Sequence, residues 1–479
     1  MNVGIRRLFV LVLGLFFLLM AGTVRWTVIE ADDLNDNPLN AREQLKTERV
    51  PRGTIRAADG TVLARSVKRS DGTYVRRYTE AAQQASQLIG YAYTNGGLAG
   101  MERAHNDDLT GKVRSAATLL SALRGSNERG NDITSTLVPA VQRAGLQGLA
   151  GRRGAAVAID TRTGGVLAMV SFPNYDPNEM GTAAGRKKLL GDTENSPLLN
   201  RATAGLYPPG STFKTVTTAA ALATGKYTPD TIVDGSSPMV VQTKELRNFG
   251  GENPGKVTLT TALTNSVNTA FARIAEDIGP EPLAEQMERF GFGKKPAFDY
   301  PSRQILASGE FNTSLSKMIP VDGNVDVARV AIGQERLRVS PLQMGLVAAT
   351  IARGGDKPRL STVARVTDKD GRTLSSLGNG RSAGRAMSER DADELAAMME
   401  NVVKEGTGTA AALAGLRVAG KTGSAEIIID QNITQPWFIG FAPADSPRVA
   451  VAVTIERTVG GTGGVTAAPI AKAMMEAAL

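Results

Sequence analysis

An uncharged apolar run, Leu8 to Val24, separates a short basic start from the rest of this 479-residue chain. An arginine pair precedes the run and Trp26 follows it closely. Such a run is just long enough to cross a bilayer as a helix, and a tryptophan suits the membrane interface. We therefore expect residues 8–24 to be an uncleaved transmembrane anchor and residues 1–7 a cytoplasmic tail, since basic residues favour the cytoplasmic side. A cleaved signal peptide is the alternative, because small residues stand near the end of the run.

Either alternative places the bulk of the chain outside the cytoplasm, and the uncleaved anchor that we expect makes the cytoplasmic membrane a partner. The chain has no cysteine and one histidine, His105, so thiol nucleophiles, disulfides and cysteine zinc sites are excluded. We expect neither a metal nor a cofactor, and His105 to be an ordinary structural residue. The net charge of +8 favours anionic partners, but the arginines are scattered, so we expect no nucleic-acid binding.

Residues 25–150 are expected to form a linker and a small module. Two extended segments, 54–58 and 61–64, flank Asp59-Gly60, a strong signal for a hairpin turn. The following residues to about 132 are polar and glycine-rich, which indicates an irregular module with a small core. The stretch "ITSTLVPAVQRAGLQGLA" then predicts a strand followed by a helix.

Residues 151–479 are expected to form one larger α/β domain. The stretch "GAAVAIDTRTGGVLAMVSF" predicts a hairpin of buried strands with its turn at 163–165. Residues 211–348 are expected to be mostly helical. Three apolar extended segments and a helix follow near the end of the chain, in "GLRVAGKTGSAEIIID", "PWFIGFAP", "RVAVAVTIER" and "AAPIAKAMMEAAL". We predict a sheet flanked by helices, in which strands from the two ends of the domain are neighbours.

The stretch "LYPPGSTFKTVTTAAAL" places Ser211 and Lys214 three residues apart at the start of a predicted helix, 212–223. At that spacing the two side chains share a face, and Ser211 lies at the positive end of the helix dipole. The ordinary interpretation is that Ser211 is a helix N-cap and Lys214 a solvated side chain. The pattern is common, and a second copy, Ser314 to Lys317, stands too close to Pro320 to sit on a helix.

A lysine acts as a base only when neutral, and burial or a second cation lowers its pKa. Lys421, in "AGKTGSAE", is the candidate for that cation. On a strand Lys421 and Gly423 share a face; Gly423 would let a substrate backbone approach, and Lys421 with Thr422 could bind a carboxylate. The segment Ser266-Val-Asn268 is a further candidate, although a helix cap is its simpler interpretation.

Residues 415–422 also match the phosphate-loop pattern G-x-x-x-x-G-K-T. A phosphate loop needs a strand before its first glycine and a helix after its threonine. Here the preceding residues favour a helix and "SAEIIID" favours a strand, so the order is reversed. We therefore do not expect nucleotide binding.

The three motifs in order, Ser-x-x-Lys, Ser-x-Asn and Lys-Thr-Gly, resemble those of the penicillin-interacting serine enzymes. Their intervals and the flanks "NRATAGLYPPGSTFK" and "WFIGFAPAD" are similar to a transpeptidase domain. The stretch "PRGTIRAADGTVLA" resembles the pedestal, or dimerisation-type, module of class B penicillin-binding proteins, and its short length resembles the compact actinobacterial members. One departure is Glu335, which follows Gln334 where many relatives have glycine.

The resemblance implies the serine transpeptidase/β-lactamase-like α+β fold: a central antiparallel sheet flanked by helices, preceded by a small, mostly β pedestal. It implies that Ser211 attacks the D-Ala-D-Ala bond of a peptidoglycan stem peptide and that Lys214 takes the proton. Ser266 would relay a proton, Asn268 would hold the donor amide, and Lys421 with Thr422 would bind the terminal carboxylate. The backbone N–H groups of Ser211 and Ser424 would form the oxyanion hole. β-Lactams would acylate Ser211.

Other functions stay open at this point. A β-lactamase or β-lactam sensor shares the motifs, but we find no glutamate motif for rapid deacylation, and an anchor suits a soluble hydrolase poorly. A bifunctional synthase would need a glycosyltransferase domain, for which the chain before the transpeptidase part is too short. The anchor and pedestal could also serve chiefly to bind and activate a glycosyltransferase of the SEDS family. Elongation and division are both compatible with the sequence.

Overall fold

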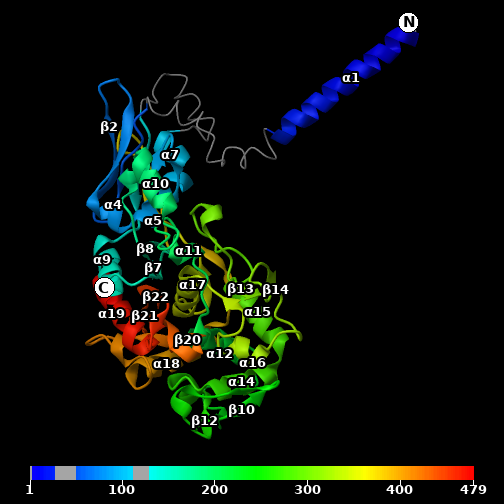
Figure 1. Ribbon diagram of the computed structural model, residues 1–479, viewed down its shortest axis with the longest axis vertical. Helices are drawn as coiled ribbons and strands as arrows, with labels where there is room; N and C mark the ends of the chain where they lie inside the picture. The colour runs from blue at the N-terminus through cyan, green and yellow to red at the C-terminus, as the bar shows by residue number, and fades with distance from the viewer. Residues whose placement is uncertain (1–2, 27–49, 112–128) are drawn as a thin grey trace.

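The computed structural model describes residues 3–26, 50–111 and 129–479. Helix α1 (Val3–Val24) begins one turn before the predicted apolar run, so the helix includes Arg6 and Arg7. Its mean hydropathy over the most apolar stretch is 2.3, and none of its side chains is buried. The helix is therefore long and apolar enough to cross a membrane. Figure 1 shows it extending away from the rest of the chain.

The N-terminal sheet has six strands in the order β18-β17-β6-β1-β2-β3. The predicted hairpin is confirmed: β1 and β2 pair antiparallel, and the Asp59 carboxylate accepts a hydrogen bond from the Thr61 N–H at 2.9 Å in the turn. Strand β1 also pairs in parallel with β6. The strands are β1 (Ile55–Arg56), β2 (Val62–Lys68), β3 (Tyr74–Tyr78), β6 (Asp132–Ser135), β17 (Val363–Thr367) and β18 (Thr373–Ser376).

Strands β17 and β18 reach this sheet from the other half of the chain. They lie far beyond residue 150, where the sequence suggested a division, yet β17 pairs antiparallel with β6 along residues 132–135. The module also holds two very short strands and four short helices, which the sequence did not indicate: β4 (Ala92–Tyr93), β5 (Gly97–Leu98), α4 (Glu80–Gln84), α5 (Ser86–Ile89), α6 (Gly100–Ala104) and α7 (Asn106–Thr110).

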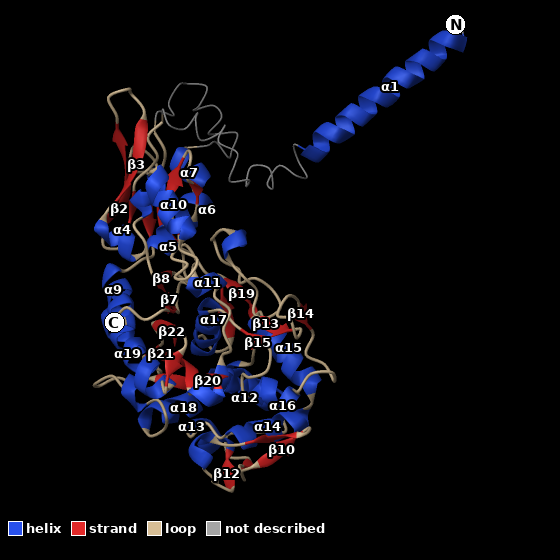
Figure 2. Cartoon of the chain, in the orientation of Figure 1, coloured by secondary structure: helices blue, strands red, loops and turns tan. Residues whose placement is uncertain are grey.

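The larger part of the chain is built on a six-stranded antiparallel sheet, five strands of which run in the order β20-β21-β22-β7-β8 (Figure 2). Strand β22 pairs with β7 along its length, so the two ends of the domain are neighbours, as predicted. The predicted hairpin of β7 and β8 is also confirmed. The bounds are β7 (Gly154–Asp160), β8 (Val166–Phe172), β20 (Ala419–Ile428), β21 (Ile433–Ala442) and β22 (Val449–Ile455); β23 (Thr458–Val459) pairs with the start of β21.

Helices cover both faces of this sheet, which explains why its strands are apolar along their whole length. Alternate residues of β7 and β22 enter two separate apolar clusters. One cluster packs against α9 (Pro139–Leu149) and α19 (Ala468–Ala478). The other packs against α17 (Pro341–Ala352) and the helices within residues 214–290. The sequence prediction of a central sheet flanked by helices is confirmed.

Helix α12 (Lys214–Ala223) lies within the helical side of the domain, and nine of its ten residues are buried. Its alanines and threonines suit that position because small side chains allow close packing, and its buried hydroxyls are satisfied by backbone carbonyls. The other helices are α10 (Ala183–Gly191), α11 (Arg201–Ala204), α13 (Leu259–Thr264), α14 (Asn268–Ile278), α15 (Pro280–Phe290), α16 (Val327–Ala331) and α18 (Glu389–Lys404).

Short strands interrupt the region 211–348, so it is less helical than the sequence suggested. They form small two- or three-stranded sheets outside the main sheet. Their bounds are β9 (Ile232–Asp234), β10 (Met239–Val241), β11 (Lys244–Leu246), β12 (Lys256–Thr258), β13 (Gly309–Phe311), β14 (Met318–Ile319) and β15 (Leu337–Arg338); β16 (Asp356–Pro358) pairs with β19 (Ser382–Arg385) later in the chain.

Candidate active site

Ser211 lies in a short 3-10 turn, η3 (Gly210–Phe213), that leads directly into α12. The N-cap position of this turn is Pro209, and no side chain caps it. The interpretation of Ser211 as an N-cap is therefore wrong, because Ser211 is the second residue of the turn itself. Within the described residues its hydroxyl makes no hydrogen bond, and the residue is half-buried. A serine hydroxyl in this setting is available to react.

Lys214, the first residue of α12, is fully buried and not solvated. Its ammonium donates to the Ser266 carbonyl and to Asn268 Oδ1, both at 2.7 Å, and to Ser266 Oγ at 3.2 Å. It also lies 5.4 Å from the centre of the Phe271 ring. Burial lowers the pKa of Lys214 well below its ordinary value, and the nearby charge of Lys421 lowers it further. Both causes favour the neutral amine that a general base requires.

Ser266 lies in the turn between α13 and α14, and its backbone is left-handed, with φ of +59°. It is not a cap, because the residue before α14 is Val267, which makes no capping bond. The Ser266 Oγ lies between two ammonium groups, at 3.2 Å from Lys214 Nζ and 3.0 Å from Lys421 Nζ. One hydroxyl thus connects the two lysines.

Lys421 and Thr422 lie on β20, the edge strand of the main sheet. The Lys421 side chain is fully buried, donates to the Thr422 carbonyl at 3.0 Å, and has its pKa lowered by burial to about 7. The Thr422 hydroxyl pairs with the hydroxyl of Thr407 at 2.6 Å. The cation expected beside Lys214 is therefore present, and it lies on a different element.

Gly423 serves a different purpose from the one expected. A Cβ at this position would lie 2.7 Å from the Pro209 carbonyl oxygen and 3.0 Å from the Thr212 nitrogen, so the chain itself fills the space that we had expected to admit substrate. The glycine lets β20 pack directly against the turn that carries Ser211. Gly210, with φ of +53°, makes the matching close approach from the other side, next to Ala425.

Asn268 and Ser424 are both engaged in bonds within the protein. The Asn268 side chain accepts from Lys214 and donates to the Arg247 carbonyl at 3.0 Å. The Ser424 hydroxyl accepts from the Gly463 N–H at 3.0 Å. Both side chains thus already have hydrogen-bond partners within the protein. For Asn268 to hold a substrate amide, as expected, its side chain would have to bond the substrate in addition to Lys214 and Arg247.

The structure brings together Ser211, Lys214, Ser266, Asn268 and residues 421–424 from three segments of the chain. Sequence reasoning missed Thr407, which lies in a loop after α18 and which no local pattern marks. It also missed Phe271, one turn beyond Asn268 on α14, whose ring faces Lys214. A search for apolar residues three positions after the Ser-x-Asn motif would have found it.

The other sequence matches considered above do not form a second site. Ser314 and Lys317 lie in an exposed turn before β14, with no helix around them. The phosphate-loop match ends inside β20, without a helix after its threonine, so the reversed order is confirmed. Within the described ranges no group of three metal-binding side chains occurs. His105 Nε2 lies 3.1 Å from the Thr362 hydroxyl, away from these motifs.

Glu335, the departure noted in the sequence, has a left-handed backbone with φ of +59° and an exposed side chain. The loop that holds it begins at Gly333, whose carbonyl accepts a hydrogen bond from the Gly210 N–H at 3.0 Å, next to Ser211. A glycine would adopt this φ without strain, whereas Glu335 carries a Cβ that disfavours it.

Comparisons with known proteins agree with this site. The family profile described as the penicillin binding protein transpeptidase domain matches residues 154–476, and the profile described as the penicillin binding protein A dimerisation domain matches residues 52–133. The chain is 35% identical to the peptidoglycan D,D-transpeptidase PbpA of Mycobacterium tuberculosis, with 100% of this chain and 99% of that protein covered. It is 36% identical to PbpA of Mycolicibacterium smegmatis over the same shares.

A solved structure of penicillin-binding protein A from M. tuberculosis, as a ceftriaxone acyl-enzyme complex, is similar over 91% of this chain and 100% of that chain. The TM-score is 0.80 and the sequence identity 32%. The motifs, the fold and these similarities agree: this chain belongs to the penicillin-binding protein transpeptidase family.

Proposed function

We propose that this chain is a peptidoglycan D,D-transpeptidase that works through an acyl-enzyme on Ser211. The observation that carries the proposal is the pair of buried lysines, Lys214 and Lys421, joined through one serine hydroxyl beside Ser211. The names of its relatives in two mycobacteria and the acyl-enzyme of a similar structure support the same activity.

In the acylation step, Ser211 Oγ attacks the carbonyl of the D-Ala-D-Ala bond while the neutral Lys214 amine takes its proton. The backbone N–H groups of Ser211 and Ser424 stabilise the oxyanion, and each donor lowers the activation free energy by about 2.7–4 kcal/mol. The C–N bond then breaks and D-alanine leaves. Ser266 passes a proton to the leaving amine, because its hydroxyl lies within hydrogen-bonding distance of both lysines. An amine of a second stem peptide attacks the ester and forms the cross-link.

The terminal carboxylate of the donor peptide binds at Lys421 and Thr422. A protonated Lys421 supplies a charge-assisted bond, and the Thr422 hydroxyl supplies a second donor when it turns from Thr407. Asn268 holds Lys214 in place and offers its amide to the donor peptide. The proton distribution that suits both roles is a neutral Lys214 beside a charged Lys421.

The test is the intact mass of the protein after incubation with penicillin. We expect an increase equal to the mass of one intact penicillin, which is lost in the variant Ser211→Ala and retained in the control Ser314→Ala, the serine of the decoy motif. An adduct that survives Ser211→Ala would refute the assignment of the nucleophile. Rapid turnover of a chromogenic cephalosporin would show instead that the chain is a β-lactamase.

We further propose that α1 anchors the protein in the cytoplasmic membrane, with residues 1–7 inside and the catalytic part outside. The N-terminal module would then be positioned to meet a SEDS-family glycosyltransferase in elongation or division. Complementation of a depletion strain separates this scaffold role from catalysis: full rescue by Ser211→Ala would show that cross-linking by this chain is dispensable.

A further inference from the structure

The segment 207–210, directly before Ser211, contains two consecutive prolines. Proline has no N–H group, so the middle of this segment can be held through its backbone only by donors that reach the proline carbonyls. The backbone at the two ends of the segment is hydrogen-bonded to Val339 and to Gly333, which lie in the stretch before α17. Neither partner belongs to the main sheet. The position of Ser211 relative to β20 therefore depends on other contacts.

Trp437, on β21, links this segment to the main sheet. Its side chain is fully buried, and its indole Nε1–H donates to the Pro208 carbonyl at 2.9 Å. In the described ranges, this is the one hydrogen bond that joins residues 207–213 to strands β20, β21 or β22. Trp437 is paired in register with Gly423 on β20, so both positions lie on the sheet face that meets the turn η3. The indole thus ties the segment to the strand pair that carries Ser424, the residue after Gly423.

Tyr207 gives the segment a second attachment. Its hydroxyl donates to Glu456 Oε1 at 2.6 Å, and Arg201 Nε donates to the same oxygen at 2.8 Å. Arg153 lies 3.3 Å from the other carboxylate oxygen. Because Glu456 is ion-paired with two arginines, the bond from Tyr207 is charge-assisted. The Tyr207 ring also packs edge-to-face against Trp437, with 6.3 Å between the ring centres, so the two aromatic residues form one unit.

We propose that Trp437 and Tyr207 are positioning residues, which set the place of Ser211 relative to Ser424 on β20. The inference rests on the proposed function, because it concerns the acylation of Ser211. Each residue acts through the backbone of the segment 207–210, since its hydrogen bond fixes the point from which the turn η3 begins. A small displacement of a nucleophile costs a large factor in rate, so loss of either bond should slow acylation more than it weakens the binding of a β-lactam.

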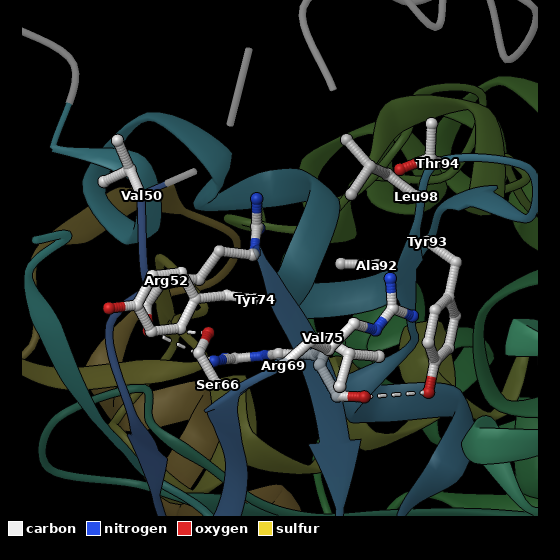
Figure 3. Close-up of a pocket in the computed structure, with 11 residues that line it drawn as sticks. Val50, Arg52, Ser66, Arg69, Tyr74, Val75, Ala92, Tyr93, Thr94 and Leu98 are labelled. Carbon is white, nitrogen blue, oxygen red and sulfur yellow. Dashed lines mark hydrogen bonds between the residues drawn. The ribbon is translucent and has the colours of Figure 1, made fainter. Parts of the chain in front are cut away.

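The test uses two variants of the full chain. Trp437→Phe keeps an aromatic ring and removes the indole N–H, whereas Tyr207→Phe removes only the hydroxyl and leaves Glu456 with its arginines. The matched control is Tyr93→Phe, which removes the hydrogen bond from a tyrosine hydroxyl to the Arg76 carbonyl in the N-terminal module (Figure 3). Because Trp437→Phe could fail to fold, Tyr207→Phe is sufficient by itself to decide the outcome.

Stopped-flow measurements over a range of penicillin concentrations separate the dissociation constant of the first complex from the rate constant of acylation. We expect this rate constant to fall about tenfold in Trp437→Phe and about threefold in Tyr207→Phe, whose bond lies one residue further from Ser211. The dissociation constant should stay within about twofold of that of the unchanged protein, because the carboxylate site on β20 is intact. Tyr93→Phe should change neither constant.

The infrared stretching frequency of the ester carbonyl in the acyl-enzyme gives a second readout. Hydrogen bonds to the carbonyl oxygen weaken the C=O bond, so a misplaced Ser211 should raise the frequency in both variants at the site. A loss of stability alone would leave the frequency unchanged.

Equal acylation rate constants in Tyr207→Phe and Tyr93→Phe, or an unchanged carbonyl frequency in Tyr207→Phe, would overturn the inference. A slower acylation that is explained entirely by a weaker first complex would overturn it as well, because the effect would then be on binding. If the unchanged protein gains no adduct, the proposed function fails and this inference fails with it.

Discussion

At the scale of single residues, the site depends on two buried lysines whose ammonium groups lie close to one serine oxygen. Lys214 and Lys421 are both completely buried, and both have lowered pKa values. Because each charge disfavours the other, the two groups titrate as a pair with two apparent pKa values. The proposed mechanism needs the state in which the two lysines together hold one titrating proton, so the pH dependence of acylation tests it directly.

We expect the second-order rate of acylation by penicillin to show a bell-shaped pH profile. The rate rises as Lys214 loses its proton and falls as Lys421, whose pKa burial lowers to about 7, loses its own. In Lys421→Arg the charge at this position persists at all working pH values. The falling limb should therefore disappear in this variant, and a stopped-flow pH series measures the change.

The matched control for this series is Lys226→Arg, an exchange at an exposed lysine. Its profile should match that of the unchanged protein. A falling limb that persists in Lys421→Arg would show that another group, and not Lys421, sets it.

Glu335 gives a second prediction at this scale. An L-residue in the left-handed region costs roughly 1–2 kcal/mol, and glycine avoids most of this cost. We expect Glu335→Gly to raise the free energy of unfolding by about 1 kcal/mol relative to Glu335→Ala, which keeps the Cβ and therefore the strain. Chemical denaturation of the unchanged protein and the two variants measures the difference in the free energy of unfolding. Equal stability of the two variants would show that the backbone at this position is not strained.

At the scale of elements, the proposed nucleophile, Ser211, is positioned by the contact between the turn η3 and the edge strand β20. Sequence alone predicted β20 as a strand and α12 as a helix, because their apolar patterns and turn residues are local. It could not predict that Pro209 occupies the space beside Gly423, because this contact joins segments far apart in the chain. The same limit explains why Thr407 was missed: its partner Thr422 stands on another element.

Gly423→Ala tests this contact. The added Cβ would lie 2.7 Å from the Pro209 carbonyl oxygen, so the turn that carries Ser211 must move. We expect a loss of about 1–3 kcal/mol in stability and at least about a tenfold fall in the acylation rate, because small displacements of a nucleophile are costly. Gly323→Ala, where a Cβ meets nothing within 4 Å, is the control and should change neither. Unchanged acylation in Gly423→Ala would refute the positioning argument.

At the scale of the whole molecule, the two halves of the chain share the N-terminal sheet through β17 and β18 (Figure 1). The sequence predicted the main sheet and the neighbourhood of its terminal strands correctly, because buried strands have a strong apolar signal. It did not predict that β17 and β18 join the N-terminal sheet, since both strands are short and Val366 is the one buried residue in the two strands. Because the two parts share one sheet, we expect their unfolding to be coupled, and unfolding measurements can detect this coupling.

We expect the described body of the protein to unfold in one calorimetric transition. Val366 on β17 is 4% exposed, and Val366→Ala should cost about 2 kcal/mol and move the whole transition. Val459→Ala, at a position that is 75% exposed, should leave the transition unchanged. Two transitions, of which only one moves in Val366→Ala, would show that the halves unfold independently.

The shared sheet also sets an order of events during synthesis. The chain leaves the ribosome from its N-terminus, and β6 ends at Ser135 while its partner β17 begins only at Val363. The outer edge of β6 therefore stays unpaired until most of the transpeptidase part has been made. An unpaired strand edge readily joins other strands, so this stage is when the nascent chain is most exposed to wrong pairing and to chaperones.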